Sequence, residues 1–341
     1  MDLPDLLDAV RDGSLSKLHP STLTLAHLTA RNAAGNTPLH LAAKLGRLND
    51  LPSGILTAES LAIKNDAGYT PLHHAALGGH LDQVPVQLLT SDTLSVRSNA
   101  GYTVFHLAAA HGVLAQLPPA LITTDVVLRK TDVGNTLLHE AAENGTLKSI
   151  PAEFVTTENL SQKNLGGETV LHVAAFNGHL DQIPAELLSS TSLRETTSAG
   201  DTVFHAAAIS GHLGQIPPQF LTHANLVVAS KTGFTAIHAA AETGQLDKIP
   251  AAQLTPDLLL TRNDNGDTPL HAAASEGHLD QLPPSVLNTE RILTRNYDGL
   301  TVEELARDRG HYEQIPVNAR PKTMNPVRRF FRNLGRSRAP F

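Results

Sequence analysis

Residues 266–277 read GDTPLHAAASEG, and seven other segments of the chain repeat this pattern. All eight share a leading Gly, a Thr, a His, a pair of Ala and a closing Gly at the same spacing. A constant period of 33 residues indicates one supersecondary unit stacked many times, with each unit burying its apolar face against its neighbours. The repeated histidines are His40, His73, His106, His139, His172, His205, His238 and His271.

The residues of one unit predict a short helix with defined ends. Thr268 precedes Pro269, the order expected for an N-cap followed by proline at the first helical position. Leu270 and the alanines three and four positions later lie on one face, which is apolar and small enough for helices to approach closely. Gly277 follows this face, so we expect the helix to end there.

The second half of each unit contains a recurrent proline. Because proline disfavours helix in the residue before it, we expect a second helix to begin at or after this position and to be short. Thr255-Pro256-Asp257 then predicts a further one-turn helix. The sequence thus predicts three short helical pieces per unit and no strands. The prolines are Pro52, Pro85, Pro118, Pro151, Pro184, Pro217, Pro250, Pro283 and Pro316.

With its 33-residue period and its TPLH motif followed by two alanines, the chain resembles the ankyrin repeat family over about residues 3–316. The resemblance implies an all-α fold, an ankyrin-type α-solenoid of 33-residue repeats with short helices and β-turn tips. The recurrent IPxxxLT second half departs from the family pattern. We divide the chain into an N-terminal capping repeat (1–31), eight ankyrin-like repeats (32–295), a C-terminal capping repeat (296–316) and a basic tail (317–341).

Composition and charge restrict the possible functions. The 341 residues include no Cys, which excludes disulfides, thiolate metal sites and cysteine nucleophiles. The net charge of −7 conceals a basic tail, since residues 317–341 contain seven Lys or Arg and no Asp or Glu. We expect neither a cleaved signal peptide nor a membrane helix, because no stretch approaches about 18 apolar residues. The expected location is the cytoplasm, with export into a host cell without a cleaved signal peptide as the alternative.

Eighteen histidines invite a metal or catalytic interpretation, but thirteen of them occupy repeat columns. We expect the TxLH histidines to bond backbone groups of the turn. His74 and His111 could approach one another from adjacent units, but no third ligand is evident. P-loop, GxGxxG, HExxH and GxSxG motifs are absent from the sequence. We therefore expect a protein without metal or cofactor that is not an enzyme, an unrecognised active site being the remote alternative.

Two columns of the repeat vary in chemistry: the residue after the turn Gly and the fourth residue after the helix His. The family resemblance implies that such positions line a concave face that binds a partner. Exposed aromatic side chains there are typical of interaction hot spots, although the same residues could instead pack partly on neighbouring units. The acidic surroundings favour a basic or amphipathic partner. The predicted partner-binding residues are Tyr69, Leu77, Tyr102, His111, Phe176, Ile209 and Phe234.

The tail contains a basic amphipathic pattern over residues 327–334, which predicts a short helix. Four interpretations stay open: a disordered solubilising tail, a segment that docks on the acidic repeats, a contact with a membrane surface or nucleic acid, and an export address. The last rests on a resemblance to Arg-rich C-termini of some proteins delivered by bacterial type IV secretion. The predicted tail contacts are Arg328, Arg329, Phe330, Phe331 and Arg332.

Taken together, these patterns predict a monomeric scaffold that binds an unidentified partner protein through the concave face of an ankyrin solenoid. The alternative is a secreted bacterial effector or membrane-recruited adaptor addressed by its tail. A nucleic-acid partner is not expected, and a membrane surface is left open only through the tail.

Overall fold

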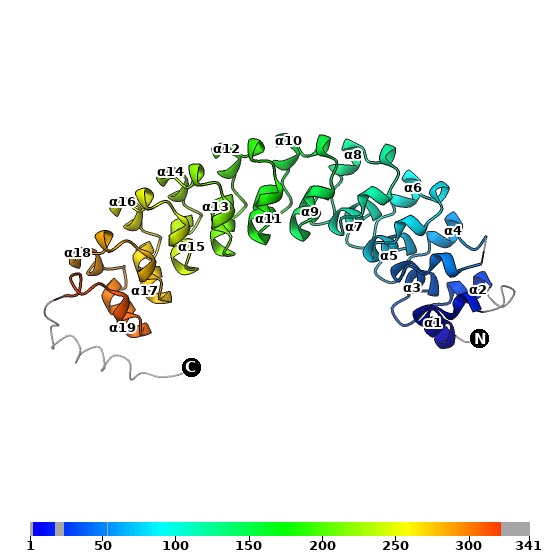
Figure 1. The fold of residues 1–341 in the computed structure, drawn as a ribbon, viewed down its shortest axis with the longest axis horizontal. Coiled ribbons are helices and arrows are strands. Elements are labelled where there is room, and N and C mark those ends of the chain that lie inside the picture. Colours follow the sequence, from blue (N-terminus) through cyan, green and yellow to red (C-terminus); the bar gives the residue numbers. More distant parts are fainter. Residues whose placement is uncertain (1–2, 18–23, 53, 322–341) are drawn as a thin grey trace. The chain divides into compact units, whose positions relative to one another are not determined.

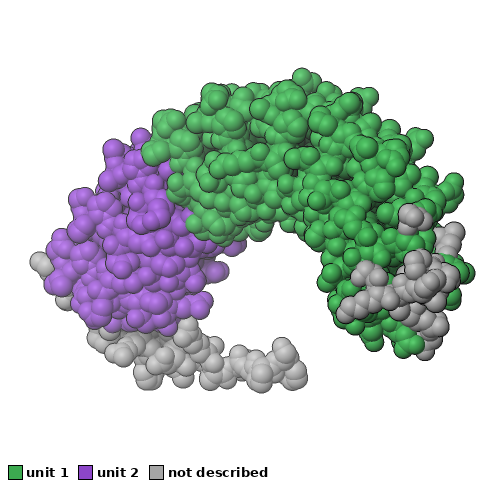
Figure 2. Space-filling view, turned by 45° about the vertical axis from the view of Figure 1, so that its right-hand side comes forward, with its two compact units in different colours: residues 1–220 green, residues 221–341 purple. Residues whose placement is uncertain are grey.

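The computed structural model describes residues 3–17, 24–52 and 54–321. In these ranges all regular elements are helices, and the β contacts are isolated bridges such as Lys163 with Thr169. The chain divides into two compact units, residues 1–220 and 221–341 (Figure 2). The all-α prediction is therefore confirmed. None of the described helices has the length and apolar character needed to cross a bilayer.

The first unit contains longer and shorter α-helices in two rows (Figure 1). The longer helices are α1 (Leu3–Asp12), α3 (Pro38–Lys44), α5 (Pro71–Gly78), α7 (Val104–Ala110), α9 (Leu137–Asn144), α11 (Val170–Asn177) and α13 (Val203–Ile209). The shorter helices are α2 (Leu25–Thr29), α4 (Ala58–Leu61), α6 (Ser91–Leu94), α8 (Thr124–Val127), α10 (Thr157–Leu160) and α12 (Ser190–Leu193).

The second unit has the same two kinds of helix. Its longer helices are α15 (Ala236–Glu242), α17 (Pro269–Glu276) and α19 (Val302–Arg309). Its shorter helices are α14 (His223–Leu226), α16 (Pro256–Leu259) and α18 (Thr289–Ile292). The N-caps of α17 and α16 are Thr268 and Thr255, each followed by proline, as the sequence predicted.

Single 3₁₀ turns occupy the segments between these helices. In the first unit they are η1 (Ser14–Lys17), η3 (Leu48–Asp50), η4 (Leu81–Gln83), η5 (Val86–Leu88), η6 (Leu114–Gln116), η7 (Pro119–Leu121), η8 (Leu147–Ser149), η9 (Ala152–Phe154), η10 (Leu180–Gln182), η11 (Ala185–Leu187), η12 (Leu213–Gln215) and η13 (Pro218–Phe220). In the second they are η14 (Leu246–Lys248), η15 (Ala251–Gln253), η16 (Leu279–Gln281), η17 (Pro284–Val286) and η18 (Tyr312–Gln314).

The prediction of three helical pieces per repeat was wrong, since the repeat that contains residues 71–94 has four. The additional piece is the 3₁₀ turn before the proline. Pro85 is the N-cap of the next turn, η5. Its fixed φ suits the start of a turn, and no hydrogen bond is lost there because the missing N–H would have no partner. A turn of three residues is too short to leave a helical period in the sequence.

Small apolar side chains fill the interface between successive longer helices. Leu39, Ala42 and Ala43 of α3 are fully buried, and so are Ala75 and Ala76 of α5. Alanine lets the backbones approach closely, as the apolar stripe predicted. The core of each unit is therefore a continuous row of contacts between neighbours rather than a single centre.

Glutamine side chains tie the second halves of successive repeats together. Gln83 accepts from the backbone N–H of Leu48 at 3.1 Å and donates to the carbonyl of Gly46 at 2.9 Å. Gln116 makes the equivalent pair of bonds to Leu81 and Gly79. Each amide thus satisfies a donor and an acceptor of the preceding repeat.

The C-terminal repeat ends in a polar helix with a capping box. Thr301 accepts from the backbone of Glu304, whose carboxylate accepts from the backbone of Thr301. Glu303 is only 7% exposed and pairs with Arg307.

Residues 317–321, assigned from the sequence to the basic tail, pack in part on the last repeat. Ala319 is fully buried. Arg320 donates to the carbonyl of Ile315 at 2.9 Å and lies over the Tyr312 ring at 4.9 Å. The packed part of the chain therefore continues past Pro316.

Candidate partner-binding surfaces

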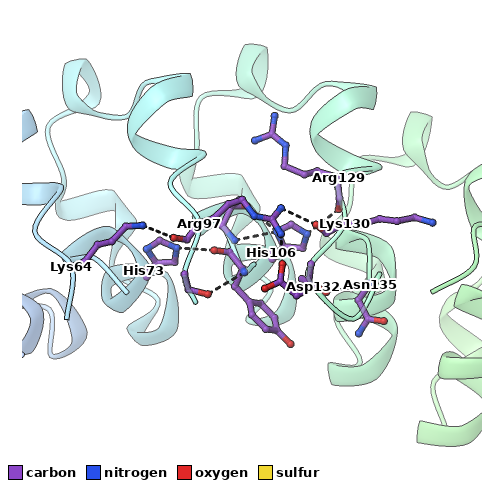
Figure 3. Close-up of polar contacts among 12 residues, drawn as sticks. Lys64, His73, Arg97, His106, Arg129, Lys130, Asp132 and Asn135 are labelled. Carbon is purple, nitrogen blue, oxygen red and sulfur yellow. Dashed lines mark hydrogen bonds and ion pairs between the residues drawn. The ribbon is translucent and has the colours of Figure 1, made fainter. Parts of the chain in front are cut away.

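The repeated histidines set the frame on which the candidate surfaces lie. His73 is buried, and its Nδ1 accepts from the backbone N–H of Thr70 at 3.1 Å. Its Nε2 therefore carries the proton and donates to the carbonyl of Tyr102, in the next repeat, at 3.1 Å (Figure 3). The predicted bonds to the turn are confirmed, and the same ring also joins two repeats.

Burial keeps these rings neutral. Desolvation lowers the pKa of His73, His106 and His139 to about 4 in each case. A neutral imidazole can accept at one nitrogen and donate at the other, which the arrangement requires. These histidines are structural, and they hold the turn that carries each variable residue.

The predicted partner-binding residues fall into both compact units. Phe234 lies in the second unit, and the other six lie in the first. Phe176 is 52% exposed and Ile209 is 46% exposed, whereas Tyr69, Leu77, Tyr102 and Phe234 are half-buried. His111 is exposed at the C-cap of α7.

Tyr69 belongs to an aromatic cluster rather than to an open surface. Its ring centroid lies 5.4 Å from that of His73 and 6.3 Å from that of His74. His74 in turn meets His40 edge-on at 5.1 Å. The Tyr69 ring thus packs on two histidines of its own repeat, and His74 lies against His40, the preceding repeat's histidine.

Tyr102 lies beside a buried carboxyl group. Glu140 is 3% exposed, and Asn135 donates to its Oε1 at 3.0 Å. Asn164 of the next repeat donates to Asn135 Oδ1 at 3.0 Å. Burial raises the pKa of Glu140 to about 7, against the opposing effect of hydrogen bonds from Asn135 and Tyr102. Burial, followed by the charges of Glu140 and Glu143, raises the pKa of Tyr102 to about 12.

The sequence did not single out Glu140 as more than an acidic neighbour. A signal was present, because most other repeats place an apolar residue in this column, such as Leu107 or Val173. A charged residue in an apolar column suggests a buried polar cluster, and the structure confirms one.

An apolar patch lies on α11 and α13. Phe176 and Ile209 occupy equivalent positions 33 residues apart, and their helices pack directly on each other. Glu143 holds the same position on α9, which packs on α11. We call the set Glu143, Phe176 and Ile209 the first-unit patch.

In the second unit, Phe234 stacks on His238 with ring centroids 5.4 Å apart. Glu242 follows one turn further along α15. Burial raises the pKa of Glu242, and the charges of Glu276 and Asp267 raise it further. This part of α15 is therefore both aromatic and acidic.

Basic side chains form a ladder along the turns, which the sequence reasoning missed (Figure 3). Lys64 donates to the carbonyl of Arg97 at 2.8 Å, Arg97 to that of Lys130 at 3.0 Å, and Lys130 to that of Lys163 at 2.7 Å. Arg97 also pairs with Asp132 at 2.6 Å. The 33-residue recurrence of basic residues was the available signal, and the ladder connects neighbouring turns.

Among the described residues, no three potential ligands are grouped so that they could hold a metal ion. The predicted tail contacts, Arg328, Arg329, Phe330, Phe331 and Arg332, lie outside the residues that the structure describes.

Comparison with known proteins identifies the repeats. The family described as ankyrin repeats in three copies matches residues 138–217, and the single ankyrin repeat matches residues 265–282. No curated protein matches the sequence. A chain in the solved structure of a predatory endopeptidase from Bdellovibrio bacteriovorus in complex with an immunity protein is 27% identical, with a TM-score of 0.40 over 53% of this chain and 94% of that chain. Residues 138–217 and 265–282 thus match ankyrin repeats, which indicate a protein–protein interaction module, and the repeated helix packing is that of an ankyrin-type α-solenoid.

Proposed function

We propose that this protein is a scaffold that binds a partner protein through the first-unit patch. The observation that carries the proposal is the exposure of Phe176 and Ile209, at 52% and 46%, on adjoining helices. Full burial of one such side chain contributes about 1.5–3 kcal/mol, so a partner that covers both would gain substantially. Large apolar side chains clustered on a surface mark interaction sites more often than isolated ones do.

The neighbouring charges suggest the character of the partner. Glu143 lies on α9, beside the apolar pair. Tyr102 directly precedes the N-cap of α7, which packs on α9, and its hydroxyl is near Glu140. An apolar pair beside carboxylates is complementary to a basic amphipathic segment, with an apolar stripe for Phe176 and Ile209 and a Lys or Arg for Glu143.

A photo-crosslinking amino acid at position 176 or 209 of the full chain tests the proposal in cells. Val86 is 67% exposed on the 3₁₀ turn η5 and provides a matched control position away from the patch. We expect positions 176 and 209 to capture the same protein and position 86 not to capture it.

The captured protein then permits a direct affinity measurement. Phe176→Ala with Ile209→Ala should weaken binding by at least about 2 kcal/mol, the hot-spot range, with helical content unchanged. Val86→Ala should leave affinity unchanged. Capture of the same protein at all three positions, or equal affinity of the double variant, would contradict the proposal.

We further propose that the protein acts by binding rather than catalysis, in keeping with the usual role of ankyrin repeats. We also propose a cytoplasmic location, as the sequence predicted. The effector alternative stays a prediction, because residues 322–341 lie outside the described part of the chain.

A further inference from the structure

A groove lies along α15, α17 and α19 of the second unit. It encloses about 190 Å³ and is lined by residues of all three helices. Apolar groups contribute to its lining, and three carboxylates surround them. We call this site the acidic groove and define it by Phe234, Ala272, Leu305, Glu242, Asp267 and Glu276.

The carboxylates of the acidic groove have no counter-charge among the described residues. No ion pair joins Glu242, Asp267 or Glu276 to a basic side chain of the described chain. The Asp267 carboxylate accepts a hydrogen bond from the neutral amide of Asn296 at 2.7 Å, and the Glu276 carboxylate accepts one from the Ser275 hydroxyl at 3.1 Å. Like charges close together raise each other's free energy, so a cation placed between them is favoured.

The rest of this chain supplies a complementary segment. The described chain ends at Pro321 in the same compact unit, and residues 322–341 contain six Lys or Arg, no Asp or Glu, and the pair Phe330 and Phe331. Phe330 is nine residues beyond Pro321 and can reach about 30 Å, whereas packed helices lie about 8–10 Å apart. The neighbouring helices α19, α17 and α15 are within this reach.

We propose that residues 327–334 of the chain's own tail occupy the acidic groove. One or more of Arg328, Arg329 and Arg332 lie between the carboxylates, and a phenylalanine covers the apolar lining. This goes beyond the proposed partner binding, because it assigns an intramolecular ligand to a separate site in the second unit.

The expected contact is weak but local. Exposed ion pairs contribute about 0–1 kcal/mol each and are screened over about 10 Å at 0.1 M salt. A short tether raises the effective concentration of the tail to the millimolar range, which allows a weak contact to be populated. Docking should therefore decrease as salt increases.

The absence of cysteine from the chain allows a site-specific test on the full-length protein. Ser275→Cys places a thiol in the acidic groove, and Asn333→Cys places one in the tail. The control pairs Asn333→Cys with Thr289→Cys, a similarly half-exposed position on α18 of the same unit. Disulfide formation is followed by gel mobility at limiting oxidant, and circular dichroism checks that each variant is folded.

We expect the Ser275 pair to crosslink at least about tenfold faster than the Thr289 pair, independently of protein concentration, as local tethering requires. Addition of 0.5 M salt, or Glu242→Gln with Glu276→Gln, should remove most of this difference. Equal rates for the two pairs, a rate that rises with protein concentration, or insensitivity to both salt and the glutamine variants would overturn the proposal. No partner enters this test, so its failure is distinguishable from failure of the proposed function.

Discussion

Glu140 of the first unit and Glu242 of the second both lie on a longer helix, and burial raises the pKa of each. Their surroundings differ. Glu140 is 3% exposed and accepts a hydrogen bond from Asn135, whereas Glu242 opens onto a groove that it shares with two other carboxylates. A raised pKa therefore marks two different situations: a satisfied buried group that stabilises the fold, and an accessible carboxyl group with no ion pair in the described part of the chain.

Acidification should produce the largest difference in stability between the two units. The pKa of His73, His106 and His139 is about 4 when folded, below the ordinary 6.5, so the unfolded state binds protons first and stability falls as pH decreases from 6.5 through 4. At pH 5 each of these histidines lowers the free energy of unfolding by about 2 kcal/mol, whereas protonation of the single Glu140 raises it by a similar amount. His74 has the same lowered pKa of about 4, so four histidines together outweigh Glu140, and the first unit should lose about 6 kcal/mol between pH 7 and pH 5.

Hydrogen exchange corrected for the intrinsic rate measures this loss helix by helix. The second unit is the internal comparison, because the pKa of its His271 is lowered to a smaller extent. Protection in α5, α7 and α9 should fall more than protection in α17. An equal fall in both units would show that buried histidines do not distinguish them.

The pH dependence of Glu140 runs in the opposite direction. Its folded pKa of about 7 lies above the ordinary 4.5, so its stabilising contribution is present at low pH and is lost as pH rises through 7. Glu140→Gln should remove this dependence, so that the loss of stability from pH 8 to pH 5 becomes larger by about 2.5 kcal/mol. Urea denaturation at several pH values measures it. Glu242→Gln is the control, and an unchanged profile in the Glu140 variant would contradict the assignment.

At pH 7 the loss of the carboxyl group itself should be smaller. Glu140→Ala leaves the Asn135 amide and the Tyr102 hydroxyl without their partner in a buried site, at a cost of about 1–2 kcal/mol. Glu242→Ala should change stability by less than about 0.5 kcal/mol, since its carboxylate is accessible. Equal thermal midpoints for the two variants would remove the distinction between a structural and an open carboxylate.

The sequence predicted the local structure better than the contacts between repeats. Thr268 and Pro269 predicted the start of α17, and the place of the histidine in the TxLH motif predicted the bond from its ring to its own turn. The second nitrogen of the ring, and both ends of Gln83, bond residues of another repeat. Those bonds depend on how repeats stack, which one repeat's residues do not reveal.

The candidate surfaces show the same limit. Variability in a column identified Phe176 and Ile209, whose exposure the structure bears out, but the same reasoning included Tyr69, which packs against two histidine rings. Exposure depends on the surrounding side chains, here those of His73 and His74, and a column considered alone omits them. For the same reason the sequence did not show that Glu140 is buried.

The basic ladder should give the smallest effect, and it separates ion pairing from bonding to a neutral carbonyl. Lys130 bonds the carbonyl of Lys163, whereas Arg97 bonds a carbonyl and also pairs with Asp132, with both charged side chains about half exposed. Lys130→Met should cost about 0.5 kcal/mol at any salt concentration, and Arg97→Met up to about 1 kcal/mol at low salt, because exposed ion pairs are worth little and are screened. Arg262→Met tests the second unit, where Arg262 donates to the carbonyls of Gly266 at 2.6 Å and Arg295 at 2.8 Å and lies over the Tyr297 ring at 5.9 Å. Thermal midpoints at 0.05 M and 1 M salt measure the three variants. Arg262 lacks a carboxylate partner among its described contacts, so the stability lost in Arg262→Met should depend on salt as little as that lost in Lys130→Met. A salt dependence as large as that of Arg97→Met would show that the ladder acts through its overall charge and not through single bonds to the next turn.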